Sequence, residues 1–387
     1  MWTMREYKIA TVPGDGIGPE VLAEGMKVMR SAFNACDVSA EFVKYPFGAE
    51  HYSRTGETIS EKSLDELKGF DAMYFGAIGD PSVPTGVLEG GILLKLRFHF
   101  DQYVNLRPVK LYEGVPCPLA GKSAKDVDFH VVRENTEDFY VGLGGRTVKC
   151  NGDFELNLSS GMGRGTHYSV RASAATDEEA FQLGVLTKGG CRRVMTYAFE
   201  LAKKKGKTLV TSVDKANVIN MYSLWRETFE EVSKHYPGIQ TEYSFVDATC
   251  MWFVKNPEHY QVVVAPNLFG DIITDLGAMI QGGMGLAPGA NINPEGISMF
   301  EPIHGSAPKY RGLNVANPIA SILAGKMMLE FIAERHGDAR MAEAAALVDG
   351  ATADILREGR VRTRDIGGSS STSQVGDAIA MRVEERS

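Results

Sequence analysis

The chain lacks any stretch of 18 or more apolar residues, so no membrane-spanning helix is expected. Its first residues, MWTMREYKIATV, are too short and too charged for a signal peptide, which makes the cytosol the predicted location. Basic residues are also few, with 41 Lys and Arg against 49 Asp and Glu, and no Lys/Arg-rich tract contains interleaved aromatic residues. These absences argue against a membrane protein and against a general nucleic-acid-binding protein.

Two further absences concern cysteine pairs and phosphate-binding motifs. The five cysteines are widely spaced and form no CxxC pair, so we expect reduced thiols rather than a disulfide framework or a zinc site. No GxxxxGK(S/T) motif occurs, and the glycine-rich segment ATVPGDGIGPEV lacks the GxGxxG spacing of a dinucleotide fingerprint. In that segment, Pro19 fits the first turn of a helix instead.

Short apolar segments alternate with longer amphipathic segments through most of the 387 residues. The expected strand and helix pairs are residues 7–12 with 19–33, 71–78 with 91–104, 207–213 with 218–236, and 260–266 with 269–280. This alternation predicts an α/β fold with a mostly parallel sheet, and the length and 44% hydrophobic content predict two domains. Residues 144–190 are rich in Gly, Ser and Thr, and they predict an irregular or β-rich arm with FELNL and HYSVRAS as half-buried strands.

Asp271 and Asp275 lie four residues apart in the helix-like segment NLFGDIITDLGAMI. Their carboxylates should project from one face of a helix about one turn apart. Two like charges held this close favour a cation between them, and oxygen-only ligands favour Mg²⁺ or Mn²⁺. Such a metal polarises a hydroxyl or carbonyl oxygen of a small acidic substrate. The alternative interpretation is a solvated acidic helix face.

Three arginines, Arg97, Arg107 and Arg133, each lie near the end of an expected strand or helix. Converging on one cleft, they would bind a dicarboxylate or tricarboxylate; the alternative is three unrelated surface arginines. Lys215 follows an expected strand, and a lysine beside a metal can serve as a general base. Tyr140 is a candidate proton donor, although most tyrosines in such positions are packing residues.

The segment EPIHGSAPKYRGLNVANP, residues 301–318, is a candidate nucleotide-binding loop. It combines His304, small residues and backbone amides ahead of an expected long helix. The alternative is an ordinary turn-rich loop of an α/β protein.

Several segments match one protein family in the same order along the chain. They are VPGDGIGPE, LR followed ten residues later by NLRPVKL, VVRENTE with Tyr140, SVDKANV, VDA at 246–248, APNLFGDIITDLGA, and EPIHGSAP with NVANP. Through these segments, and on to RDIGGSSSTSQVGDAI, the chain resembles the metal-dependent β-decarboxylating dehydrogenases of isopropylmalate, isocitrate, homoisocitrate, tartrate and D-malate. The resemblance implies an isopropylmalate-dehydrogenase-like fold with helices on both faces of the sheets. A large nucleotide-binding domain would span 1–112 and 255–387, and a smaller domain, 113–254, would carry a dimer arm at 144–190.

The resemblance also implies roles for individual residues. The substrate carboxylates would be held by Arg97, Arg107 and Arg133, beside a pocket that includes Leu93 and Leu94. Lys215 would be the catalytic base and Tyr140 the proton donor. The implied metal ligands are Asp247, Asp271 and Asp275, with Asp247 and Lys215 supplied by the second subunit of a homodimer. The implied cofactor-binding residues are Asn217, Glu301, His304, Gly305, Ser306, Ala307, Lys309, Tyr310 and Asn317.

The implied reaction oxidises the C2 hydroxyl of a 3-substituted D-malate with NAD(P) and then releases the β-carboxylate as CO₂. Leu93 and Leu94 resemble the isopropylmalate pocket, but the acidic residue expected there falls on Gly90. The surrounding segment also resembles tartrate and D-malate dehydrogenases, which stay open as alternatives. Isocitrate is disfavoured because Gly91 and Leu93 offer no side-chain hydrogen bond to a third carboxylate. Homoisocitrate is likewise a less favoured substrate.

The choice between NAD and NADP rests on the residues after HGSAP. Lys309 and Tyr310 stand where NAD-dependent members usually carry an acidic residue, and they resemble the NADP-dependent isocitrate enzymes. A cation there favours a 2′-phosphate, and Arg311 adds positive charge. Ala316 resembles the NAD pattern, and the segment after Arg364 is too short for the further 2′-phosphate contacts. We expect NADP in preference to NAD.

Two other classes of protein fit parts of the sequence. A noncatalytic regulatory subunit would keep the fold, but the presence of Lys215, Tyr140 and all three aspartates argues against it. A Mg²⁺-dependent phosphoryl-transfer enzyme would also use paired aspartates, but it requires a phosphate-binding motif that the chain lacks.

Overall fold

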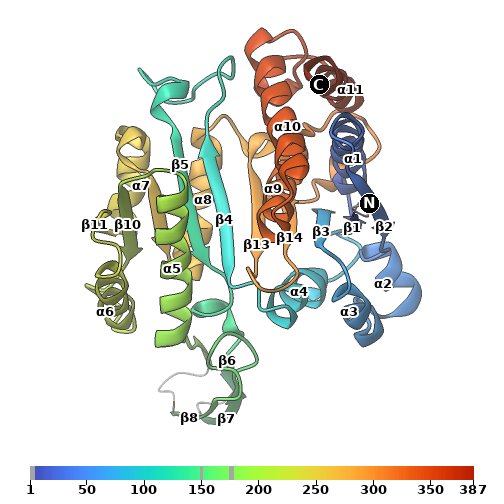
Figure 1. Ribbon diagram of the computed structural model, residues 1–387. Helices are drawn as coiled ribbons and strands as arrows, with labels where there is room; N and C mark the ends of the chain where they lie inside the picture. Colours follow the sequence, from blue (N-terminus) through green and yellow to red (C-terminus); the bar gives the residue numbers. More distant parts are fainter. Residues whose placement is uncertain (1–4, 149–150, 174–177) are drawn as a thin grey trace. The chain divides into compact units, whose positions relative to one another are not determined.

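The computed structural model describes residues 5–148, 151–173 and 178–387, and the chain divides into two compact units (Figure 1). Unit 1 consists of Met1–Leu96, Leu106–Asp128 and Asp275–Ser387, and unit 2 consists of Arg97–Asn105 and Phe129–Thr274. The strand β4 (Val104–Lys110) and the helix α8 (Asn267–Ile280) each run through a junction between the units. The domain boundaries predicted at 112/113 and 254/255 differ from the bounds of these two units. The predicted roles of the domains remain predictions.

Unit 1 contains a mostly parallel sheet. Its strands, in spatial order, are β4, β13 (Pro288–Ile292), β14 (Met299–Pro302), β3 (Ala72–Ala77), β1 (Glu6–Gly14) and β2 (Ser39–Lys44). β1 pairs in parallel with β2 and β3, and β14 pairs in parallel with β3, whereas β13 and β14 are antiparallel. Every residue of β3 is buried, as expected for an apolar strand covered on both faces.

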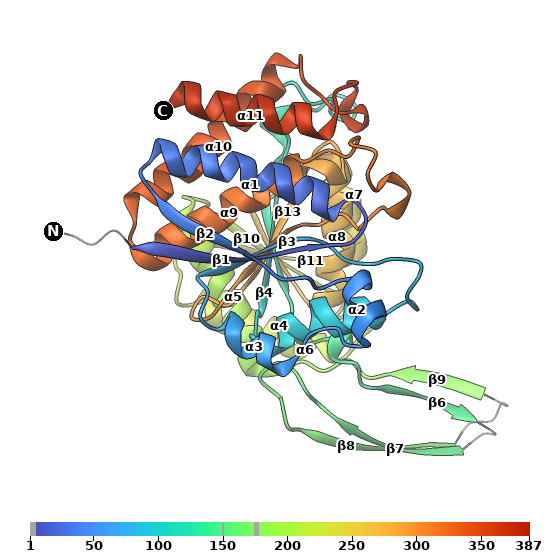
Figure 2. The same ribbon diagram turned by 90° about the vertical axis from the view of Figure 1, so that its right-hand side faces the viewer.

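The helices of unit 1 come from both ends of the chain. They are α1 (Gly18–Ala35), α2 (Ala49–Thr55), α3 (Glu61–Leu67), α9 (Ile319–His336), α10 (Ala339–Glu358) and α11 (Thr372–Arg386). Short 3₁₀ turns are η2 (Ala124–Asp126), η5 (Met284–Leu286), η6 (Pro308–Tyr310) and η7 (Arg364–Ile366). α1 and α9 pack against the sheet, and α10 and α11 pack against α1 (Figure 2). Pro19 lies in the first turn of α1, as predicted.

Unit 2 has its own parallel strands. Their spatial order is β11 (Gln240–Phe245), β10 (Leu209–Asp214), β12 (Val262–Ala265) and β5 (Asp128–Glu134). The helices are α5 (Lys188–Lys204), α6 (Tyr222–Ser233), α7 (Val246–Lys255) and the first part of α8, with 3₁₀ turns η3 (Phe139–Val141) and η4 (Pro257–His259). Figure 1 shows α5 in front of these strands and α8 behind them, so helices cover both faces.

A four-stranded antiparallel sheet forms where the β-rich arm was predicted (Figure 2). Its spatial order is β8 (His167–Ser173), β7 (Asn151–Asn157), β6 (Gly144–Val148) and β9 (Glu178–Gln182). Half-buried residues alternate with exposed ones along β7 and β8, which confirms the prediction for FELNL and HYSVRAS. Phe154 and Phe181 pack edge to face, with ring centroids 4.8 Å apart. Residues 149–150 and 174–177 of the predicted arm lie outside the described residues.

Two predicted helices are shorter than expected. In place of one helix over 91–104, the chain forms a π-helical turn, η1 (Glu89–Leu94), and the short helix α4 (Lys95–His99). The helical conformation does not continue because Asp101 adopts a φ of 46°, outside the right-handed helical region. The helix predicted over 218–236 begins only at Tyr222 and ends at Ser233.

No helix in the described part of the chain is long and apolar enough to cross a membrane. Four cysteines are free thiols, namely Cys36, Cys117, Cys191 and Cys250, and Cys150 lies outside the described residues.

Candidate active site

The two predicted metal ligands Asp271 and Asp275 both lie on α8. The helix begins directly after Pro266, and Asp271 and Asp275 stand one turn apart on it, as predicted. Asp271 belongs to unit 2 and Asp275 to unit 1. Their side chains are 38% and 58% exposed, so both carboxylates are accessible to a ligand.

Arg133 lies near the end of β5, and its side chain is only 1% exposed. Its Nη1 donates to Asp271 Oδ1, and its Nε and Nη2 donate to Asn267 Oδ1 at 2.9 and 2.7 Å. Burial lowers the pKa of Arg133, the Asp271 carboxylate opposes that shift, and the positive charge of Arg97 adds to it. Arg97 and Arg133 therefore share one electrostatic environment within unit 2.

Tyr140, in the turn η3, meets the same aspartate. Its hydroxyl donates to Asp271 Oδ2 at 2.7 Å, and its ring centroid lies 5.1 Å from the Arg133 guanidinium carbon. Burial raises the pKa of Tyr140, and the hydrogen bond to Asp271 raises it further. The hydroxyl therefore stays protonated at neutral pH, which is the state that a proton donor requires. The structure thus brings together three predicted residues, Arg133, Tyr140 and Asp271.

The predicted substrate residues of unit 1 occupy two other elements. Arg107, on β4, points its Nη1 toward Asp275 Oδ1 at a distance of 3.5 Å. Leu93 and Leu94 lie half-buried in the π-helical turn η1. The convergence of Arg107 with the two arginines of unit 2 stays a prediction.

Lys215 and Asp247 form a second ion pair in unit 2. Lys215 directly follows β10, Asp247 lies in the first turn of α7, and Lys215 Nζ is 2.5 Å from Asp247 Oδ1. The hydrogen bond from Lys215 holds the pKa of Asp247 below its usual range. Asn217 is exposed in the turn after Lys215. Two predicted residues that are 32 positions apart in the sequence are thereby placed in direct contact.

The donor set on α8 suits a hard divalent cation. Mg²⁺ is commonly held by one or two carboxylates together with water and substrate oxygens, and Asp271 and Asp275 offer such carboxylates. Among the described residues, no three His, Cys, Asp or Glu side chains gather closely enough to hold a metal ion. A single copy of the described chain therefore offers a pair of aspartates rather than a complete protein cage.

The predicted nucleotide loop follows β14 in unit 1. Burial lowers the pKa of His304, whose Nε2 is buried and has no hydrogen-bond partner within the described residues. Ala307 adopts a left-handed conformation with a φ of 40°. The Ser306 carbonyl accepts a 2.8 Å hydrogen bond from Ile17 N, and a Cβ on Gly16 would lie 1.9 Å from the same oxygen. Gly16, the middle glycine of GDGIG, is therefore needed for this contact between two loops.

Other residues of this loop are either anchored or exposed. Asn317 lies two residues before α9, and its Oδ1 accepts a 3.0 Å hydrogen bond from Ile319 N, the first amide of the helix. Glu301, at the end of β14, accepts a 2.7 Å hydrogen bond from a neighbouring asparagine side chain. Lys309 and Tyr310 are exposed in η6, with Lys309 Nζ 4.8 Å from the Tyr310 ring centroid. The loop therefore carries an orphaned ring nitrogen as well as exposed cationic and aromatic side chains, which are groups that fit a nucleotide.

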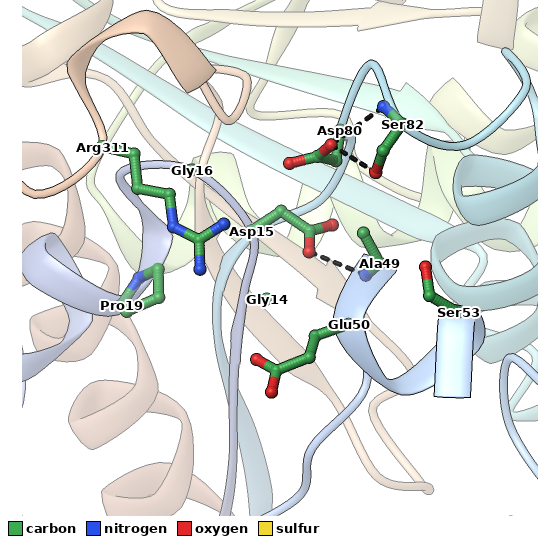
Figure 3. A pocket seen from close by; sticks show the side chains of 10 residues that line it. All are labelled: Gly14, Asp15, Gly16, Pro19, Ala49, Glu50, Ser53, Asp80, Ser82 and Arg311. Atoms are coloured by element: carbon green, nitrogen blue, oxygen red, sulfur yellow. Dashed lines mark hydrogen bonds between the residues drawn. The ribbon is translucent and has the colours of Figure 1, made fainter. Parts of the chain in front are cut away.

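A pocket of about 230 Å³ adjoins this loop in unit 1 (Figure 3). It is lined by Gly14, Asp15, Gly16, Pro19, Ala49, Glu50, Ser53, Asp80, Ser82 and Arg311. The Asp15 carboxylate accepts from Ala49 N at 2.8 Å, and Arg311 brings a guanidinium from the nucleotide loop to the pocket. Of these residues, only Arg311 was predicted to contact a ligand, because the pocket is assembled from separate segments that form no single local motif.

Three buried carboxyl groups lie between Arg133 and Tyr140 in the sequence: Glu134, Glu137 and Asp138. Burial raises the pKa of Glu134 to about 7, and the negative charge of Glu137 adds to this shift. Burial also raises the pKa of Asp138 to about 6, while the hydrogen bond from Leu268 N opposes that shift. Asp138 thereby binds the first turn of α8 at 2.8 Å. No local sequence pattern indicates this cluster, because burial of a carboxyl group depends on tertiary packing.

The chain is similar to known proteins in both sequence and fold. The model of the family described as isocitrate/isopropylmalate dehydrogenase matches residues 8–379. The chain is 45% identical to a 3-isopropylmalate dehydrogenase of Thermobifida fusca (strain YX), over 99% of both chains. It is 43% identical to a D-malate dehydrogenase [decarboxylating] of Escherichia coli (strain K12), over 97% of this chain and 98% of that protein. The crystal structure of isocitrate dehydrogenase from Methylococcus capsulatus superimposes with a TM-score of 0.81 at 31% identity, covering 98% of this chain and 99% of that one.

The fold, the charged residues gathered on β5, η3 and α8, and these similarities define the class of the protein. It is a dehydrogenase acting on an alcohol group with decarboxylation. The chain belongs to the isocitrate/isopropylmalate dehydrogenase family.

The raised pKa of Glu134 predicts a specific pH dependence of stability. Its folded-state pKa of about 7 lies above the ordinary 4.5, so the folded protein binds more protons between these pH values. The stability contributed by protonated Glu134 is therefore present below pH 4.5 and is lost as the pH rises through 7. Glu134→Gln removes this titration. The stability of wild type minus that of the variant should fall between pH 5 and pH 8, by up to ~1.4 kcal/mol per pH unit.

Urea unfolding of both proteins across this pH range measures the difference. An exposed control on α6, Glu227→Gln, should show a constant difference from wild type. A difference that also stays constant for Glu134→Gln would contradict the assignment of a protonated buried carboxyl group.

Proposed function

We propose that the protein catalyses the NAD(P)-dependent and divalent-metal-dependent oxidative decarboxylation of a 3-substituted D-malate. The observation that carries this proposal is the meeting of Arg133 and Tyr140 on the two carboxylate oxygens of Asp271. An anion-binding cation, a proton donor and an oxygen ligand for a metal are the groups that this chemistry needs in one place. The names of the 3-isopropylmalate and D-malate dehydrogenase relatives support the same substrate class.

Each side chain has a proposed part in the reaction. A divalent metal would be held by Asp271 and Asp275 and would supply Lewis-acid polarisation of the substrate C2 oxygen. Lys215 would accept the proton of the C2 hydroxyl, and a bound nicotinamide would supply the hydride acceptor for C2. Arg133, with Arg97 and Arg107, holds the carboxylates, and Tyr140 donates a proton to C3 after the loss of CO₂.

The substituent on the malate distinguishes the candidate substrates. Leu93 and Leu94 offer an apolar wall, and a Cβ built on Gly90 meets nothing within 4 Å. An alkyl group such as that of isopropylmalate suits this surface. D-malate or tartrate is the second candidate, supported by the 43% identity to a D-malate dehydrogenase. Gly91 and Leu93 provide no side-chain donor for the third carboxylate of isocitrate.

A homodimer with shared sites is the proposed assembly. Lys215 and Asp247 already pair within unit 2, so a second copy would deliver them together. Asp247 lies on α7, where Met251, Trp252 and Val254 are 70%, 43% and 48% exposed. Large apolar side chains exposed on one helix favour burial against another protein surface.

The cofactor proposal is NADP in preference to NAD. Lys309 is exposed beside Tyr310, and Arg311 reaches the adjoining pocket, so the loop presents two cations near the expected adenosine ribose. Guanidinium and ammonium groups favour a phosphate over a hydroxyl at such a position.

The reaction and the metal site are tested together. Purified protein is mixed with Mn²⁺, either nucleotide and a panel of isopropylmalate, D-malate, tartrate and isocitrate, and the absorbance at 340 nm is followed. Asp275→Asn should lower kcat by roughly a hundredfold or more, because transition-state charge stabilisation is worth several kcal/mol. Stabilisation of the fold by Mn²⁺ should also be lost. This variant is preferred over Asp271→Asn because Asp271 is the ion-pair partner of the buried Arg133.

Asp377→Asn serves as the matched control, since Asp377 is also an exposed aspartate in an ion pair, with Lys27 at 2.6 Å. It should leave both turnover and the Mn²⁺ response unchanged. No reduced nucleotide with any of the four acids would overturn the reaction, and full activity of Asp275→Asn would overturn the metal site.

Shared sites predict complementation between two inactive chains. Lys215→Ala and Tyr140→Phe are each expected to be inactive, but a hybrid dimer of the two contains one site with both wild-type residues. Equal mixing under subunit exchange should restore roughly a quarter of wild-type activity, since half of the dimers are hybrids with one intact site of two. Hybrids that are separated by a tag and remain inactive would argue that Lys215 and Tyr140 act within one chain.

The preference for NADP predicts the effect of reversing one charge. Lys309→Asp should shift the kcat/KM ratio of NADP over NAD by about ten- to a hundredfold toward NAD, because a charge-assisted contact is lost and a carboxylate repels the phosphate. Lys309→Ala should give a smaller shift, since it removes the cation without adding a ribose acceptor. A wild-type preference for NAD that neither substitution changes would show that this loop does not read the 2′ position.

A further inference from the structure

The amide of Asn267 contacts the Nε and Nη2 edge of the Arg133 guanidinium, whereas Asp271 contacts Nη1. Asn267 Oδ1 accepts from both Nε and Nη2, at 2.9 and 2.7 Å. Its Nδ2 donates to the Glu137 carbonyl at 3.2 Å, which sets the orientation of the amide because only the nitrogen can donate there. Asn267 is itself 1% exposed. Both ends of this amide are therefore committed inside unit 2.

The neighbouring turn of α8 is shaped around the same arginine. A Cβ at Gly270 would lie 2.5 Å from Arg133 Cγ and 2.7 Å from its Cβ, so only glycine leaves room for the side-chain stem. Asn267, Gly270 and Asp271 are spaced three and four residues apart, which puts them on one face of the helix. On that face, Gly270 leaves room for the side-chain stem of Arg133, Asn267 binds two guanidinium nitrogens, and Asp271 binds the third.

The neutral charge of Asn267 affects Arg133 as much as the position of its amide does. A buried arginine is usually balanced by a carboxylate, which also neutralises it. Asn267 supplies the same acceptor oxygen without a negative charge, so Asp271, at Nη1, balances Arg133 without a second carboxylate on the Nε and Nη2 edge. An aspartate at position 267 would keep the acceptor and add that second negative charge.

We propose that Asn267 is a positioning residue that fixes the Arg133 guanidinium through Nε and Nη2 and, being neutral, adds no second carboxylate that would compete with the substrate carboxylate for Arg133. The inference rests on the proposed function of Arg133 in holding that carboxylate. It predicts that changes at Asn267 act on substrate binding only through Arg133.

A double-mutant cycle tests this dependence. KM and kcat for the accepted malate are measured for wild type, Asn267→Ala, Arg133→Lys and the double variant, because lysine lacks the Nε and Nη2 pair that Asn267 binds. Asn267→Ala should raise KM about tenfold in the wild-type background, the cost of one hydrogen bond to a charged group, and less than about twofold in the Arg133→Lys background. A purely structural role would give the same change in KM in both backgrounds and would overturn the proposal.

A charge variant covers the case in which Asn267→Ala fails to fold. Asn267→Asp keeps the acceptor for Arg133 but places a carboxylate oxygen against the Glu137 carbonyl, so the unfolding midpoint should fall while KM rises at least about tenfold. Gln281→Glu is the matched control, a buried amide that accepts from Lys110 N at 2.8 Å and does not bind Arg133. It should lower the unfolding midpoint and leave KM unchanged. An Asn267→Asp protein with wild-type KM would overturn the proposal.

The two proposals fail separately. If wild type turns over none of the four acids, the proposed function fails, and the same cycle is then measured as thermal stabilisation by the dicarboxylate malonate. Stabilisation that depends on Asn267 only when Arg133 is present would support the positioning role. Equal loss in both backgrounds, or no stabilisation of wild type, would overturn it.

Discussion

Burial of the Arg133 guanidinium is the constraint on which the rest of the candidate site depends. Removing a cation from water costs several kcal/mol unless protein groups replace the lost hydration. Here the replacements are the amide oxygen of Asn267, the carboxylate of Asp271 and the ring face of Tyr140. These groups come from α8 and η3, so surrounding one charge also fixes a candidate metal ligand and a candidate proton donor. The geometry needed for chemistry follows from the need to stabilise a buried ion.

The two units hold different parts of the proposed chemistry. Unit 2 contains Arg97, Arg133, Tyr140 and the Lys215–Asp247 pair, and unit 1 contains Arg107, Asp275 and the predicted nucleotide loop. The helix α8 runs through the junction and carries one aspartate of the pair in each unit. Hydrogen bonding within a continuous helix keeps these two carboxylates one turn apart, whatever happens elsewhere in the chain.

Family membership constrains the reaction more tightly than the substrate. Relatives named for 3-isopropylmalate and for D-malate are 45% and 43% identical, a difference too small to choose between them. The distinction between these acids is one alkyl substituent, and burial of each methylene is worth only ~0.8 kcal/mol. In the proposed site, a few side chains in the turn η1 would therefore change the preferred acid while the arginines, the tyrosine and the aspartates stay the same.

The sequence by itself determined the α/β class, the β-rich arm and the spacing of Asp271 and Asp275, because apolar periodicity and helix geometry are local properties. It did not determine where helices end: apolar residues continue past Asp101, whose positive φ reflects its surroundings in the fold. Only the tertiary structure placed Asn267 against Arg133, raised the pKa of Glu134 and assembled the pocket beside Arg311. Each of these features depends on burial or on contacts between segments that are far apart in the sequence. No local window of the sequence contains such information.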